Sequence, residues 1–159
     1  MTIALRPALP SDGSALEHVF RDSIAVLTED DYADAQRAAW ASAADDSAAF
    51  GERLAKNLTL VAVRDGALSG FATLAGETIE MLYVHPDHAR RGVATALIDA
   101  LEKLAHARGV AALQVDASDT AQAFFGGRGY GAKQRNSLRI GGEWLASTTM
   151  KKQLSGAKN

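Results

Sequence analysis

The segment from Leu82 to Leu97 is the part of this sequence that most clearly indicates a chemical function, because a basic loop leads there into a long amphipathic pattern. Arg90 and Arg91 precede Gly92, and the small residue Ala94 follows it. A helix N-terminus offers unpaired N–H groups and a positive dipole end, both of which attract phosphate. Gly92 lets the backbone approach an anion closely. The segment therefore predicts a phosphate site, and its spacing fits neither a P-loop nor a dinucleotide fingerprint.

A carboxylate and an imidazole lie just before this loop. Alternation along the expected strand Thr78–Val84 places Glu80 on one face with Leu82 and Val84. There Glu80 could accept a proton, through water, from an incoming amine, or it could be a solvated strand carboxylate. His85 follows the strand and could contact an acceptor or act as a base, although a turn residue is the simpler interpretation.

Two aromatic residues upstream could form the wall of an acceptor pocket. Tyr32 and Trp40 belong to the alanine-rich stretch Tyr32–Phe50, which is expected to be helical. Aromatic side chains at helical spacing are often core residues, so both interpretations stay open for each.

The order of expected elements predicts an α/β fold with a mixed sheet. A first strand and two helical stretches precede a three-stranded meander, and a helix, a strand, a short helix and a final hairpin follow. Asp65-Gly66 and Gly141-Gly142 are hairpin signals. The expected strands are Thr2–Arg6, Leu58–Val63, Leu68–Leu74, Thr78–Val84, Leu113–Ala117, Ala132–Ile140 and Glu143–Lys151, and the expected helices are Pro10–Ile24, Tyr32–Phe50, Gly92–Arg108 and Ser118–Phe125.

Bulk properties narrow the class of protein. The 159 residues, 47% apolar and 23% charged, suit one folded domain over residues 1–154, with a disordered tail at 155–159. The net charge of −2 gives no electrostatic reason to expect nucleic acid or an anionic membrane as a partner. Without cysteine, disulfides and thiolate chemistry are excluded, and the four histidines are too scattered to predict a metal site. The start lacks the pattern of a signal peptide, so we expect a cytoplasmic protein.

Two motifs give the chain a family resemblance. Ala89-Arg90-Arg91-Gly92-Val93-Ala94 resembles the pyrophosphate loop of the GNAT acetyltransferases, with Ala89 where the family has glutamine or arginine. Ala121–Tyr130 resembles the family's closing motif, an alanine-rich helix that ends in Gly-Phe or Gly-Tyr. The resemblance covers nearly the whole chain. The segment Tyr32–Trp40 is similar to that of a bacterial branch of GNAT proteins, many of which have no assigned substrate.

The resemblance implies a sheet of about six to seven strands flanked by about four helices, and an N-acetyltransferase that uses acetyl-CoA without a metal. Acetyl-CoA would lie where Thr78–Val84 and Leu113–Ala117 splay apart, and a small-molecule or peptide amine would attack it directly. Ser118 matches a family asparagine that contacts the pantetheine arm, although it could simply cap a helix. The expected cofactor-binding residues are Leu82, Tyr83, Val84, Arg90, Arg91, Gly92, Val93, Ala94, Thr95, Ser118 and Phe124. The expected catalytic residues are Glu80 and Tyr32, and the expected acceptor contacts are Tyr32, Trp40 and His85.

One position departs from the family. Many members carry a tyrosine five residues before the Gly-Phe aromatic, and its phenol protonates the leaving thiolate; here that position is Phe125. The thiolate could leave without an acid, Tyr32 could replace the phenol, or the protein could be a non-catalytic acyl-CoA-binding module. A third alternative is an acetyltransferase-like fold that serves as a toxin or antitoxin partner, and the net charge of −2 speaks against a toxin that acts on charged nucleic acid. A homodimer is possible, but no sequence feature demands one.

Overall fold

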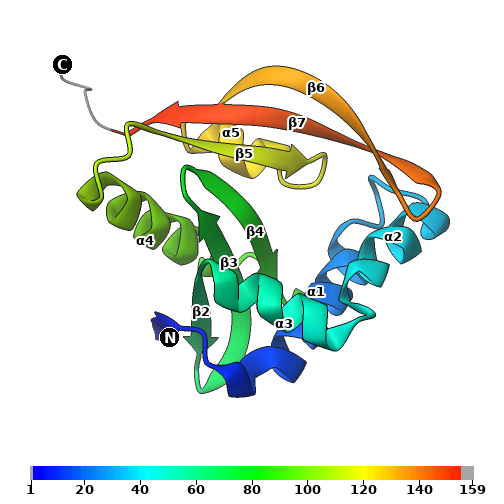
Figure 1. Cartoon of the computed structure of the whole chain (residues 1–159), viewed down its shortest axis with the longest axis horizontal. Helices are drawn as coiled ribbons and strands as arrows, with labels where there is room; N and C mark the ends of the chain where they lie inside the picture. The colour runs from blue at the N-terminus through cyan, green and yellow to red at the C-terminus, as the bar shows by residue number, and fades with distance from the viewer. Residues whose placement is uncertain (1, 155–159) are drawn as a thin grey trace.

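Seven strands form one mixed sheet in the order β1-β2-β3-β4-β5-β7-β6 (Figure 1). The computed structural model describes residues 2–154, so the predicted tail at 155–159 lies outside the described residues. The strands are β1 (Ile3–Pro7), β2 (Leu58–Arg64), β3 (Ala67–Ala75), β4 (Thr78–Val84), β5 (Ala112–Ser118), β6 (Gly131–Ile140) and β7 (Glu143–Gln153). The helices are α1 (Gly13–Leu27), α2 (Asp34–Ala41), α3 (Ser47–Lys56), α4 (Val93–Ala107) and α5 (Gln122–Gly127), with short 3-10 turns η1 (Pro10–Asp12), η2 (Ser42–Ala44) and η3 (Pro86–His88). The predicted mixed α/β fold is confirmed.

The junction between β4 and β5 is the one parallel pairing in this sheet, and it is short. The two strands pair only at Thr78 with Gln114 and at Ile79 with Val115. Every other pair of neighbouring strands is antiparallel and runs over five or more residues. Figure 1 shows β5, β7 and β6 above β4, β3 and β2, with the gap between the two groups. The predicted splaying of these two strands is confirmed.

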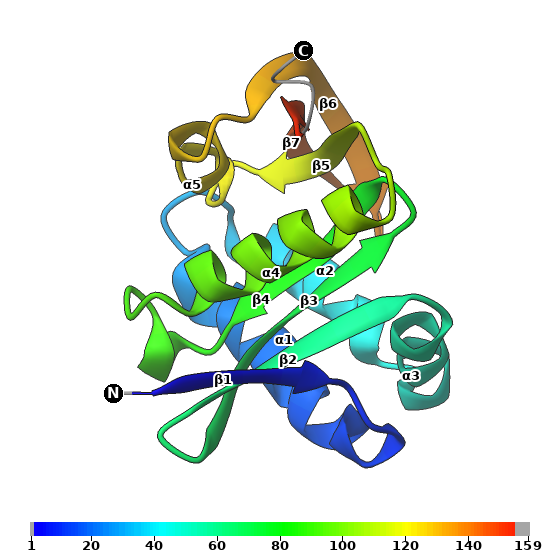
Figure 2. The same ribbon diagram turned by 90° about the vertical axis from the view of Figure 1, so that its left-hand side faces the viewer.

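Two apolar cores, one on each face of the sheet, hold the strands. Helix α4 lies across one face of the sheet (Figure 2). It buries Leu97, Ile98 and Leu101 there, as the i, i+3, i+4 pattern predicts. On the other face α1 buries Leu16 and Phe20, and α3 adds further apolar side chains. The two faces of the sheet are therefore covered separately, one by α4 and the other by α1 and α3.

Both predicted tight hairpins form. Asp65 and Gly66 adopt φ values of 52° and 83°, and Gly141 and Gly142 adopt 53° and 84°. Positive φ at both central residues is the signature of the type I′ turn, which matches the twist of antiparallel strands.

Two helical segments differ in detail from the prediction. The stretch Tyr32–Phe50 is largely helical, as predicted, but it is broken into α2, η2 and the start of α3, and the Asp46 side chain caps α3 by accepting the N–H of Ala49 at 3.0 Å. With this break, residues 2–154 contain five α-helices, close to the expected number of about four. Ser118 ends β5 instead of opening a helix, and α5 begins at Gln122. No helix among the described residues is long and apolar enough to cross a membrane.

A glycine in β3 fixes how closely β4 can approach. Gly70 lies opposite Val84, and a Cβ added at Gly70 would lie 2.9 Å from the Tyr83 carbonyl oxygen and 3.0 Å from Val93 Cγ1. Either β4 or the start of α4 would have to move.

We therefore expect Gly70→Ala to lower the free energy of unfolding by about 1–3 kcal/mol, measured by urea denaturation. Gly51→Ala is the matched control, because Gly51 lies inside α3 with no atom within 4 Å of the added Cβ. That variant should gain about 0.5–1 kcal/mol. Equal effects of the two changes would contradict the close approach at Gly70.

Candidate active site

A cavity of about 470 Å³ follows the gap between β4 and β5. Its wall comes from these two strands, the η3–α4 loop, α5 and parts of α1 and α2. Most of the residues predicted for the site line it: Trp40, Glu80, Leu82, Tyr83, Val84, Arg90, Gly92, Val93, Ala94, Thr95, Ser118 and Phe124. The structure therefore brings together segments that lie far apart in the sequence.

One end of the cavity is built for an anion. Gly92 is the N-cap of α4 with φ of 87°, and Arg90 also has a left-handed backbone with φ of 61°. The first hydrogen bond within the helix runs from the N–H of Ala96 to the carbonyl of Gly92 at 3.0 Å. The helix itself therefore supplies no acceptor for the N–H groups of Val93, Ala94 and Thr95. Arg90 lines the cavity beside them, whereas the side chain of Arg91 is exposed and lies outside the lining.

The edge of β4 forms one side of the gap. Beyond Ile79 this edge has no backbone partner from β5, and Leu82, Tyr83 and Val84 line the cavity there. Such an edge can pair with an extended amide-containing ligand as if with another strand. Ser118 and Phe124 lie on the opposite wall, where the Ser118 hydroxyl accepts the N–H of Ala121 at 3.1 Å.

A β-bulge places Glu80 differently from the sequence prediction. Thr73 pairs with Met81 and Leu74 pairs with Ile79, which leaves Glu80 as the extra residue of β4. Its carboxylate meets Arg53 of α3, with Oε1 and Nε 3.4 Å apart. The expectation that Glu80 shares the face of Leu82 and Val84 is therefore wrong, because those two side chains pack toward the α4 core. A bulge interrupts strict alternation and is common beside active sites.

The end of the cavity that faces α1 and α2 combines aromatic rings with hydroxyl groups. Trp40 Nε1 donates to the Tyr83 hydroxyl at 3.1 Å, and burial raises the pKa of Tyr83 to about 12, so this phenol keeps its proton at neutral pH. Ser23 and Thr28 line the same end. Apart from Glu80, the carboxylate in the lining of the cavity is Asp116 of β5, which accepts a hydrogen bond from Thr149 at 2.7 Å.

Three residues of the cavity lining were not predicted from the sequence: Ser23, Thr28 and Asp116. For two of these residues the sequence did contain a signal. Asp116 interrupts an apolar strand between Val115 and Ala117, and Ser23 adjoins the buried apolar stripe of α1. Thr28 directly follows the end of α1 at Leu27. The sequence pattern ends this helix earlier, at about Ile24, and so gave no signal for Thr28.

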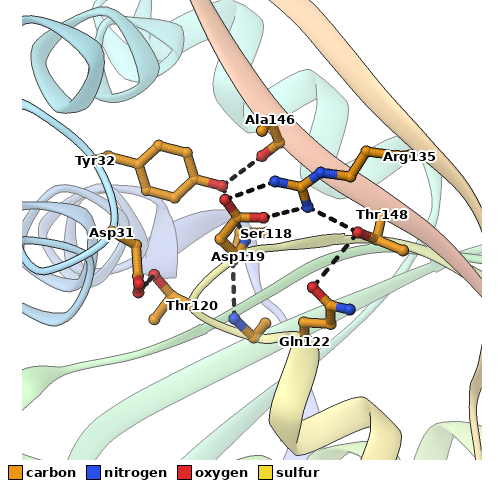
Figure 3. Close-up of polar contacts among 10 residues, drawn as sticks. Asp31, Tyr32, Ser118, Asp119, Thr120, Gln122, Arg135, Ala146 and Thr148 are labelled. Carbon is orange, nitrogen blue, oxygen red and sulfur yellow. Dashed lines mark hydrogen bonds and ion pairs between the residues drawn. The ribbon is translucent and has the colours of Figure 1, made fainter.

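Like Arg91, the predicted residues Tyr32 and His85 lie outside the cavity lining. Tyr32 is only 6% exposed, and its phenol donates to the Ala146 carbonyl and accepts the N–H of Asp119 (Figure 3). His85 accepts the N–H of Asp87 at Nδ1, so its Nε2 carries the proton and donates to Asp22 at 2.9 Å. His85 thus caps η3 and ties it to α1, consistent with the turn interpretation.

Phe125 does line the cavity, but as part of the core. It is 1% exposed, and its ring meets that of Tyr130 with centroids 5.1 Å apart. Among residues 2–154, no group of three or more histidine, aspartate or glutamate side chains is placed to hold a metal ion.

Comparisons with known proteins agree with this geometry. Residues 28–154 match the family model described as an acetyltransferase (GNAT) domain. The uncharacterized N-acetyltransferase YafP of Escherichia coli K12 is 32% identical over 149 residues, which cover 94% of this chain and 95% of YafP. A crystal structure from Rhodopseudomonas palustris, named both as a GCN5-related N-acetyltransferase and as a class-II aminotransferase, is 58% identical with a TM-score of 0.95 and covers 97% of each chain.

A more distant structure shares the fold alone. The PaiA N-acetyltransferase of Thermoplasma acidophilum, solved in complex with coenzyme A, is 18% identical with a TM-score of 0.79 and covers 96% of this chain and 99% of its own. Together, the family match and the YafP similarity show that this chain belongs to the GNAT superfamily of acetyl-CoA-dependent N-acetyltransferases.

The loop before α4 gives the first test of the site. Gly92→Val should weaken CoA binding at least tenfold, about 1.4 kcal/mol, because the added side chain blocks the approach of a phosphate to the helix N-terminus. Isothermal titration calorimetry measures the affinity.

Gly109→Val is the matched control, because Gly109 follows the other end of α4 with a nearly equal φ of 85° and open space around it. Both variants carry the same backbone strain, so only Gly92→Val should lose affinity. Unchanged affinity in folded Gly92→Val would refute the phosphate assignment.

Proposed function

We propose that this protein transfers the acetyl group of acetyl-CoA to a primary amine by direct attack in a ternary complex. The divergence of β4 and β5 after two residue pairs carries this proposal, because it opens one continuous cavity with two unlike ends. The end at α4 suits a phosphate-bearing donor, and the end at α1 and α2 suits an amine.

The donor would lie along β4. Its pantetheine amides would pair with the free edge at Leu82–Val84, and its pyrophosphate would lie at the N-terminus of α4 beside Arg90. Ser118 and Phe124 would contact the arm from the opposite wall. The fold relative PaiA was solved in complex with coenzyme A, which supports coenzyme A as the ligand of this fold.

The acceptor would enter from the side of α1 and α2. Ser23, Trp40 and Tyr83 offer hydroxyl groups and aromatic surface there, which suits a small molecule or the end of a peptide. Glu80 takes a proton from the ammonium, directly or through water. The free amine nitrogen then attacks the thioester carbon, the C–N bond forms, and the C–S bond breaks to release the thiolate. The nitrogen loses its extra proton to water, which leaves the neutral amide.

The leaving thiolate needs no acid from the position of Phe125. A thiol with a pKa of about 8.5 is a fair leaving group and can take its proton from water. Tyr32 is a poor substitute for the missing phenol, because its single proton is already donated to Ala146 and its ring lies outside the cavity lining. We therefore propose departure without a side-chain acid.

The phenylalanine at this position favours one competing function, a non-catalytic acyl-CoA-binding module. Release of free thiol from acetyl-CoA in the presence of a panel of primary amines separates the two. Release with at least one amine supports the enzyme, whereas tight CoA binding without release on any amine supports the module. A cytoplasmic location and a homodimer stay predictions.

Glu80→Gln should lower turnover at neutral pH by about a hundredfold, because it removes the proton acceptor, while CoA affinity stays nearly unchanged. Glu77→Gln is the matched control, since Glu77 lies in the exposed turn before β4 and outside the cavity lining. Full turnover in Glu80→Gln would exclude Glu80 as the base, and a loss in Asp116→Asn instead would assign that role to Asp116.

Phe125→Tyr should change turnover less than about tenfold if the thiolate leaves without an acid. Steady-state thiol release with a responsive amine measures this. A large gain from a baseline near zero would show that the natural chain lacks a required acid and functions as a binding module.

A further inference from the structure

The gap between β4 and β5 needs a support that the sheet does not provide. Backbone pairing between the two strands stops after Ile79 and Val115. Beyond that point β4 is held by β3 and β5 is held by β7. A cleft that grips an extended ligand needs a fixed width, so another interaction must set the separation of its two walls.

A chain of three aromatic side chains begins on the β4 wall. The Tyr83 hydroxyl accepts a hydrogen bond from Trp40 Nε1 at 3.1 Å. The ring of Trp40 then meets the ring of Tyr32 edge to face, with centroids 5.4 Å apart and planes at 73°. This geometry is the favourable one for aromatic pairs, and rings lose few rotamers on ordering.

The chain ends on the opposite wall (Figure 3). The Tyr32 phenol donates to the Ala146 carbonyl of β7 at 2.5 Å and accepts the N–H of Asp119, just after β5, at 2.9 Å. The Asp119 carboxylate is in turn held by both terminal nitrogens of Arg135 from β6, at 2.6 and 3.0 Å. A bidentate pair of this kind fixes orientation as well as distance.

A second contact ties the same segments together. Asp31, next to Tyr32, accepts a hydrogen bond from the Thr120 hydroxyl at 2.7 Å. Ser118 and Thr120 flank Asp119, and both line the cavity. A shift of Asp119 would therefore move the β5 wall of the site directly.

We propose that Tyr83, Trp40 and Tyr32 form a bridge across the gap that sets the separation of β4 and β5, with the Tyr32 phenol as a positioning group for the acetyl-CoA site. The inference rests on the proposed function and assigns Tyr32 a role other than that of an acid. Within the bridge, the Tyr32 hydroxyl donates to the Ala146 carbonyl and accepts from the Asp119 N–H. Burial raises the pKa of Tyr32, so its phenol stays protonated at neutral pH.

Tyr32→Phe tests the bridge, because it keeps the ring against Trp40 and removes only the hydroxyl. Tyr130→Phe is the matched control: Tyr130 is also buried, and its phenol donates to Glu102 at 2.8 Å, away from the cavity lining. We expect Tyr32→Phe to weaken CoA binding about fivefold by calorimetry, and Tyr130→Phe to stay within about twofold. Amide hydrogen exchange at Asp119–Ala121 should quicken only in Tyr32→Phe, since the Asp119 N–H loses its acceptor.

A double-mutant cycle extends the test to the far end of the bridge. Arg135→Met should also weaken CoA binding, and the double variant should lose less binding free energy than the sum of the two single variants, because both changes act on Asp119.

The pH profile of turnover should keep its shape in Tyr32→Phe, with the change in KM for acetyl-CoA larger than the change in kcat.

Three results would overturn the bridge. These are unchanged CoA affinity in folded Tyr32→Phe, an equal loss of affinity in Tyr130→Phe, and the loss of a limb of the pH profile with unchanged affinity, which would make Tyr32 an acid. Failure of the wild-type protein to bind CoA would instead refute the proposed function, so the two failures are distinguishable.

Discussion

The structure depends on a parallel pairing that ends after two residue pairs. Where β4 and β5 separate, each loses one row of backbone partners, and a buried backbone group without a partner is costly. The sheet is nevertheless stable on either side of the gap, because β3 pairs with β4 and β7 pairs with β5. The unpaired edge is thus available to a ligand that carries amides, and the proposed position of pantetheine satisfies this edge.

The same separation divides the site into two chemical environments. On one face the α4 helix brings its N-terminus, Gly92 and Arg90 to the end of β4, which creates an electropositive pocket without any metal ligand set. On the other face α1 and α2 bring Ser23 and Trp40, and Glu80, the extra residue of the bulge in β4, meets Arg53 of α3. In the proposed reaction, the acceptor amine can therefore reach the thioester of the bound donor from the face opposite α4.

The parts of this site that depend on local rules were predictable from the sequence. The glycine and arginine spacing before α4, its apolar stripe and the two glycine-containing hairpins are short-range signals, and the structure confirms the elements that they predict. The bulge at Glu80 was not predictable, since it arises from the register between β3 and β4 rather than from β4 alone. The partners of Tyr32 were equally hidden, because Asp119 and Ala146 lie 87 and 114 residues away in the chain.

The central claim is that the free edge of β4 and the N-terminus of α4 hold one ligand between them. Amide hydrogen exchange of the wild-type protein with and without CoA tests it most directly. Binding of CoA should slow exchange at Leu82–Val84 and at Gly92–Thr95 together, while exchange at the β6–β7 hairpin tip at Gly141 stays unchanged. Protection of only one of the two segments, or protection confined to the hairpin, would contradict it.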